Sequence, residues 1–102
     1  IDLWRYDVRA RRWTELTPPR MPVTHSGDQA MVTATWARRL VMFAAHDSDL
    51  YRADQTWVFG LDAGTWTSSK PSPSPPARVG AGLLADPVRR RVLLMGGGWG
   101  LG

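Results

Sequence analysis

The chain has 102 residues, of which 43% are hydrophobic, and a formal net charge of +4 at pH 7. This length suits one domain, and the hydrophobic share is large enough for a packed core. The sequence contains no cysteine, no apolar run long enough for a membrane-spanning helix and no signal-peptide pattern, which leaves the compartment open and excludes disulfides and thiolate sites. Almost all of the basic residues are arginines without interleaved aromatics, so we expect neither a nucleic-acid nor a membrane partner.

In chain order, the apolar pattern has the two-residue period of β-strands. Large residues alternate with polar or small ones in IDLWRYDV and in TWVFGL, while the runs RRLVMFAA and RRRVLLMGGG suit strands buried on both faces. The sequence therefore predicts an all-β fold with antiparallel strands at residues 2–8, 13–16, 29–35, 39–45, 55–61, 65–69, 79–86 and 91–97.

The pattern of these segments repeats. Trp57 and Trp66 lie 53 positions after Trp4 and Trp13, and the run from Val92 lies 52 positions after the run from Leu40. A repeat of about 50 residues with about four short strands per unit is typical of a β-propeller blade.

The repeat resembles the kelch family, and bacterial galactose-oxidase-type kelch repeats in particular. The phrase PPARVGAGLLADPVRRRVLLMGGG carries the likeness, together with paired glycines after the second strand (Gly96 and Gly97), an aromatic third strand (Trp57 and Phe59, or Trp4 and Tyr6) and a tryptophan that opens the fourth strand (Trp66 or Trp13). The match covers nearly the whole chain. It departs from the pattern at Ala44 and Ala45, which replace the glycine pair, and at Ser26, which stands where Arg78 begins the other repeat.

The resemblance implies a single propeller segment over residues 1–102, about two blade-equivalents in size. Residues 1–16 would form the outer strands of one blade, residues 29–69 a complete blade, and residues 79–97 the inner strands of the next. We expect Trp13 and Trp66 to occupy equivalent places in the core with hydrogen-bonded indoles, and the buried residues to include Val41, Phe43, Leu93 and Met95. Because such half-blades leave apolar flanks, the chain is expected to be a fragment of a longer propeller or to form a homo-oligomer.

Antiparallel topology sorts the polar residues onto two opposite faces. The short hairpin turns carry most of the arginines, which we interpret as a solvated surface: Arg9, Arg11, Arg12, Arg38, Arg39, Arg89, Arg90 and Arg91. The longer connections at 16–28, 46–54 and 68–78 lie on the other face, where a rigid scaffold places its binding residues.

The candidate ligand-binding residues belong mainly to the segment HDSDLYRAD. They are His25, His46, Asp47, Asp49, Tyr51, Arg52 and Trp99. Trp36 and Trp99 fall outside the repeat, so we expect them to be exposed. The acidic spacing does not match an EF-hand, and the two histidines lack a third ligand, so we predict no metal and no cofactor.

These features favour a kelch-type scaffold that binds a protein or peptide, or else a carbohydrate, through the loops of one face. Two alternatives stay open: a fragment of a carbohydrate-active or galactose-oxidase-like enzyme, and a structural module that assembles into a closed ring. Galactose-oxidase relatives use a copper site with a cysteine-modified tyrosine, which cannot be carried over to a chain without cysteine. No nucleophile elbow, P-loop or dinucleotide fingerprint is present, so no catalytic residue is predicted.

Overall fold

The computed structural model describes residues 2–22, 30–45, 54–78 and 80–98. These residues form β-strands and one 3-10 turn, η1 (Thr35–Ala37), and none of their helices is long and apolar enough to cross a membrane. The strands are β1 (Trp4–Asp7), β2 (Arg12–Glu15), β3 (Ala30–Ala34), β4 (Arg39–Ala45), β5 (Gln55–Gly60), β6 (Trp66–Ser69), β7 (Gly82–Asp86) and β8 (Arg91–Met95).

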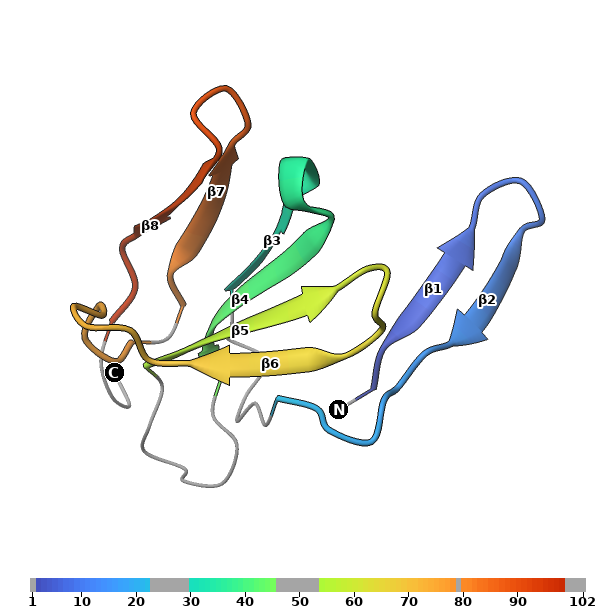
Figure 1. Cartoon of the computed structure of the whole chain (residues 1–102), viewed down its shortest axis with the longest axis horizontal. Coiled ribbons are helices and arrows are strands. Elements are labelled where there is room, and N and C mark those ends of the chain that lie inside the picture. The colour runs from blue at the N-terminus through green and yellow to red at the C-terminus, as the bar shows by residue number, and fades with distance from the viewer. Residues whose placement is uncertain (1, 23–29, 46–53, 79, 99–102) are drawn as a thin grey trace.

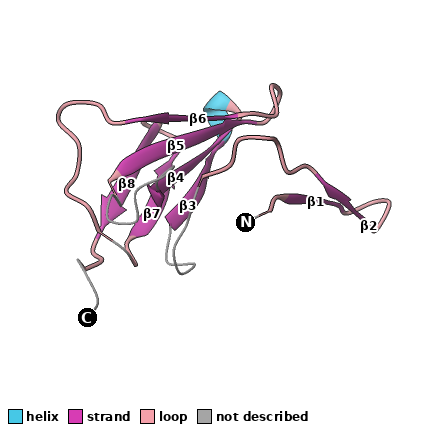
Figure 2. Ribbon diagram, turned by 90° about the horizontal axis from the view of Figure 1, so that it is seen from below, coloured by secondary structure: helices cyan, strands magenta, loops and turns pink. Residues whose placement is uncertain are grey.

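Among the described residues each strand pairs with its sequence neighbours, in antiparallel sheets of order β1-β2, β3-β4-β5-β6 and β7-β8. The predicted all-β fold with two, four and two strands is therefore confirmed, and it is compatible with a propeller fragment. The β7–β8 sheet packs beside the central sheet, whereas the β1–β2 hairpin stands apart on the other side (Figures 1 and 2).

The central sheet has two apolar faces because side chains alternate along each strand. One face, which we call the aromatic face, carries Leu40, Met42, Trp57, Phe59 and Trp66, all placed together by the registers Met42↔Trp57, Leu40↔Phe59 and Phe59↔Trp66. The opposite face, which we call the aliphatic face, carries Val32, Val41, Phe43 and Val58. Two buried faces on one sheet explain the continuous apolar run of β4.

Different segments cover the two faces. Leu3 and Met21, which flank the first hairpin in the chain, pack on the aromatic face, where Trp57 is fully buried and Phe59 and Trp66 are 3% and 4% exposed. The aliphatic face receives the β7–β8 sheet, since Phe43 packs against Ala77, Leu83 and Leu94. The core therefore lies on the two faces of the central sheet, where the segments before and after it in the chain pack against it.

The outer hairpins of the first and central sheets have the same geometry. Tyr6 pairs with Trp13 at a ring-centroid distance of 5.0 Å and an interplanar angle of 50°, and Phe59 pairs with Trp66 at 5.1 Å and 49°. The two hairpins therefore repeat the same geometry, but the prediction that Trp13 lies in the core is wrong for the chain by itself, since Trp13 is 60% exposed and Trp66 is 4% exposed.

Leu93 and Met95 were predicted to be buried, and this is wrong for the chain by itself: they are 43% and 70% exposed. On the central sheet Phe43 is buried and Val41 half-buried because the β7–β8 sheet covers that face. The equivalent residues of β8 point to the opposite side from Leu94, where no further sheet lies among the described residues.

The glycine pair of the repeat also has a structural role. Gly96 and Gly97 leave β8 with φ angles of 76° and 85°, in the left-handed region that glycine adopts without steric cost. At the corresponding place, Ala44 and Ala45 continue β4, and the pairing with β5 becomes irregular between Phe43 and Ala45.

Candidate functional site

The short turns and the longer connections lie at opposite ends of the strands. The turns β1–β2, β3–β4 and β7–β8 lie along the upper side in Figure 1, while residues 16–22, which follow β2, run along the lower side. This is the two-face arrangement that the antiparallel pattern predicts.

All the residues proposed from the sequence as ligand-binding lie outside the described residues. They are His25, His46, Asp47, Asp49, Tyr51, Arg52 and Trp99. Trp36, which was expected to be exposed, is instead half-buried in η1 on the turn side. The described residues at this end of the sheets are those at which the connections enter and leave the strands.

Asp54 and Lys70 form an ion pair across the loop end of the central sheet. The Lys70 Nζ lies 2.6 Å from Asp54 Oδ2, with the Asp54 side chain 15% exposed and that of Lys70 47% exposed. Asp54 directly precedes β5 and Lys70 directly follows β6, so the antiparallel pairing of these strands brings the two charges together. The pair joins the residue that enters β5 to the residue that leaves β6.

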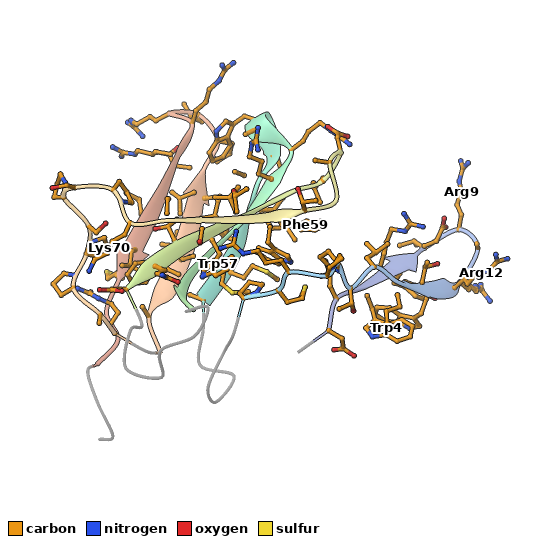
Figure 3. All side chains as sticks on the ribbon, turned by 60° about the horizontal axis from the view of Figure 1, so that its bottom comes forward. Trp4, Arg9, Arg12, Trp57, Phe59 and Lys70 are labelled. Carbon is orange, nitrogen blue, oxygen red and sulfur yellow. The ribbon has the colours of Figure 1, made fainter. Side chains whose placement is uncertain are left out.

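Arg20 brings the third connection to the same place. Its Nη2 donates to Ser68 Oγ at 3.2 Å, and its guanidinium carbon lies 5.1 Å from the ring centroid of Trp57. A guanidinium at this distance from an indole is attracted by the electrons of the ring. Arg20, Asp54 and Lys70 come from three different connections and therefore lie at the same end of β5 and β6. Figure 3 places Trp57 and Lys70 in this part of the central sheet.

Two acceptors beside this cluster lack a hydrogen-bond partner. Asp54 Oδ1 and Gln55 Oε1 are both buried and unpaired within the described part of the chain, as are the indole nitrogens of Trp57 and Trp66. The expected hydrogen-bonded indoles are therefore absent from the described central sheet. A buried polar group without a partner typically lowers the stability of the fold by about 1–3 kcal/mol. These atoms are therefore places where a further hydrogen bond would be favourable.

The first hairpin shows how part of this bonding can be satisfied. Trp4 Nε1 donates to Asp2 Oδ2 at 2.9 Å, and the equivalent residues of the central sheet are Trp57 and Gln55. Gln55 Oε1 thus has an indole donor two residues away in sequence, at the position where the repeat makes a bond. Asp54 has no such counterpart, because the equivalent position is Ile1. We name Arg20, Asp54, Ser68 and Lys70 the loop-end cluster.

Ion pairs on the turn face form both between neighbouring turns and within a single turn. Arg38 is bidentate on Asp62, with Nε and Nη2 at 3.0 and 2.8 Å from its two oxygens. This contact raises the pKa of Arg38 and lowers the pKa of Asp62, chiefly through the side-chain hydrogen bond. Asp86 similarly accepts from Arg89 and Arg91. Several turn arginines therefore serve local structure, as expected for a solvated turn surface.

Sequence reasoning did not nominate any member of the loop-end cluster as a binding residue. Asp54 was part of the segment HDSDLYRAD, and its position one residue before a strand is the signal that could have separated it from the rest. Arg20 and Ser68 carry no such signal, since 48 positions separate the two residues that meet.

The cluster offers charge and hydrogen bonding rather than a metal centre. Among the residues that the structure describes, no three His, Cys, Asp or Glu side chains are grouped so as to hold a metal ion. No protein-family model matches the chain, and no solved structure matches it.

Proposed function

We propose that the protein is a binding module that takes a protein or peptide segment on the face bearing the long connections. The loop-end cluster supports this proposal, and the observation that carries it is Asp54 Oδ1, which is buried and has no hydrogen-bond partner among the described residues. Lys70 holds one oxygen of this carboxylate, and the other oxygen, without a partner in the described part of the chain, can accept a hydrogen bond from a donor that reaches it.

The chemistry of the cluster favours a donor-rich partner. A backbone amide, an asparagine or a basic side chain of a peptide would satisfy Asp54 Oδ1, and the half-exposed Lys70 offers a charge to a carboxylate nearby. A rigid sheet end with connections of mixed charge around it suits an extended segment better than a small molecule enclosed in a cavity. The kelch-like repeat is compatible with this use.

The experiment is a selection followed by a matched substitution. The purified 102-residue chain is panned against a phage-displayed peptide library and, in parallel, exposed to a glycan array. The dissociation constant of a selected peptide is then measured for the wild type, for Asp54→Asn and for Arg9→Ser, a turn-face control. Loss of a hydrogen bond to a charged acceptor costs about 1.5–3 kcal/mol, so Asp54→Asn should weaken binding by roughly 10- to 100-fold.

Arg9→Ser should change the affinity by less than about twofold, because Arg9 lies at the far tip of the first hairpin (Figure 3). Circular dichroism confirms that both variants fold. A larger loss for Arg9→Ser than for Asp54→Asn would contradict the assignment of the binding face. Glycan binding without any selected peptide would replace a peptide partner by a carbohydrate.

A further inference from the structure

We propose that two copies of this chain join edge to edge, with β1 of one copy pairing with β8 of the other. Within the described residues, β1 pairs only with β2 and β8 only with β7, so each of these strands has one open edge. Open edges present unpaired backbone groups that readily accept another strand. The inference goes beyond the proposed binding function, since it concerns different surfaces.

The central sheet supplies the register of this contact. There β4 pairs with β5 through Met42↔Trp57, Val41↔Val58, Leu40↔Phe59 and Arg39↔Gly60. The repeat replaces β4 by β8 and β5 by β1. Transferring the register residue by residue sets Leu94 opposite Trp4, Leu93 opposite Arg5, Val92 opposite Tyr6 and Arg91 opposite Asp7.

This register would bury the exposed aromatic residues of the first hairpin. Trp4, Tyr6 and Trp13 are 47%, 42% and 60% exposed, whereas their equivalents on the central sheet are buried. In the joined sheet they share a side with Leu94, which is the side that packs against the central sheet of its own copy. The aromatic side chains would therefore lie on the aliphatic face of the second copy, near Val58.

The two halves cannot meet within one copy. The β1–β2 hairpin stands on the opposite side of the central sheet from β7–β8 (Figure 2). Pairing between copies is therefore head to tail, and such contacts generate a ring when the rotation closes. Each copy contributes one four-stranded and two two-stranded sheets, so two, three or four copies give four, six or eight blades, within the range of about 4–8 blades known for propellers.

Charges at the junction are partly matched. Arg91 of one copy faces Asp7 of the other, and opposite charges directly across an antiparallel pair are favourable. At the turn, the ion pair Arg38–Asp62 of the central sheet is replaced by Arg90 facing Arg9. An exposed pair of this kind changes an equilibrium only a few-fold, whereas a strand ladder with three aromatic side chains contributes much more. The mismatch weakens the contact without preventing it.

Cross-linking tests the register directly, since the natural chain has no cysteine. A chain carrying Arg5→Cys is mixed with a chain carrying Leu93→Cys, and disulfide formation is followed under mild oxidation. Both residues are exposed, so neither substitution disturbs a packed core. Directly opposite residues have Cβ atoms about 4.5–5.5 Å apart, close to what a disulfide requires.

The matched control mixes the Arg5→Cys chain with a chain carrying Val92→Cys, one residue out of register and on the other side of the sheet. We expect the Leu93 mixture to cross-link at least about tenfold faster than the control, and light scattering on the wild type to give a multiple of 11.4 kDa. Equal rates in the two mixtures, or a folded monomer of 11.4 kDa at every concentration up to the millimolar range, would overturn the proposal.

A charge substitution tests the turn contact. Arg9→Asp recreates the acid of Asp62 opposite Arg90 and should tighten the association roughly threefold to tenfold at low salt, with the gain shrinking as salt screens it. Arg11→Asp makes the same change of net charge two residues away, at the position of Gly64, which makes no contact with Arg38 in the central sheet. An equal gain from both variants would show that only net charge matters and would contradict the proposed turn contact.

Discussion

Equivalent turns of the repeat hold different residues in the same left-handed backbone conformation. The turn of β1–β2 places Arg11 at a φ of 53°, and the equivalent turn of β5–β6 places Gly64 at a φ of 73°. A residue with a side chain pays about 1–2 kcal/mol for the left-handed conformation, which glycine adopts without that cost. The repeat therefore fixes the backbone of the turn more strictly than the residue that occupies it.

This leads to a prediction at Gly64. No heavy atom lies within 4 Å of a Cβ built at this position, so Gly64→Ala introduces no clash and its effect comes from the backbone alone. We expect the free energy of unfolding to fall by about 1 kcal/mol, because the left-handed strain exceeds the entropy gained in the unfolded state. Urea denaturation measures this change. An unchanged or raised midpoint would mean that the turn relaxes out of the left-handed region.

Strands were the most predictable elements. Each of the eight expected segments overlaps a strand of the structure, and only β2 begins one residue before its expected segment, because alternation of large and small residues has a local cause in side-chain direction. The alternation pattern does not predict that Leu93 and Met95 are exposed. Alternation shows which side chains share a face, but it does not show whether a neighbouring sheet covers that face.

The same reasoning separates the equivalent tryptophans Trp57 and Trp4. Trp57 is fully buried within the core cluster against which Leu3 and Met21 pack, whereas Trp4 is 47% exposed. Trp57→Ala should lower the free energy of unfolding by about 3–5 kcal/mol through the cavity it leaves. Trp4→Ala should cost about 1 kcal/mol, as is usual for a partly exposed site.

Chemical denaturation of both variants at a concentration below self-association measures the difference, and Trp57→Phe replaces Trp57→Ala if the latter does not fold. Similar losses at the two positions would show that the first hairpin is packed as firmly as the central sheet.

At the scale of the whole molecule, stability is uneven. The central strands β4 and β5 have neighbours on both edges, while β1 and β2 form an isolated pair in which every residue is exposed. A two-stranded hairpin by itself is marginally stable in water. The central sheet is therefore expected to be more stable than the β1–β2 hairpin.

Hydrogen exchange should report this contrast. In dilute protein we expect the amides of residues 4–15 to exchange about 100-fold faster than those of residues 39–43 and 55–60, because local opening of the hairpin leaves the core intact. Mass spectrometry of peptic peptides measures both regions in one experiment. Equal protection of the two regions in dilute protein would contradict the uneven stability, and protection of residues 4–15 that grows with concentration would accompany the proposed pairing.

The loop-end cluster was less predictable than the sheets for a physical reason. Asp54 and Lys70 meet because β5 and β6 are paired, so correct strand assignment already brings them to the same sheet end. Arg20 reaches Ser68 through a connection whose path depends on packing across the aromatic face, and no local pattern encodes that path.

The unequal burial of the tryptophans gives the protein a built-in optical signal. Buried indoles such as Trp57 and Trp66 emit at shorter wavelengths than wet indoles such as Trp4 and Trp13. Unfolding exposes Trp57 and Trp66 to water and shifts the emission to longer wavelengths. A partner that covers the first hairpin removes Trp4 and Trp13 from water and shifts the emission to shorter wavelengths. Unfolding and association therefore shift the tryptophan emission of this protein in opposite directions.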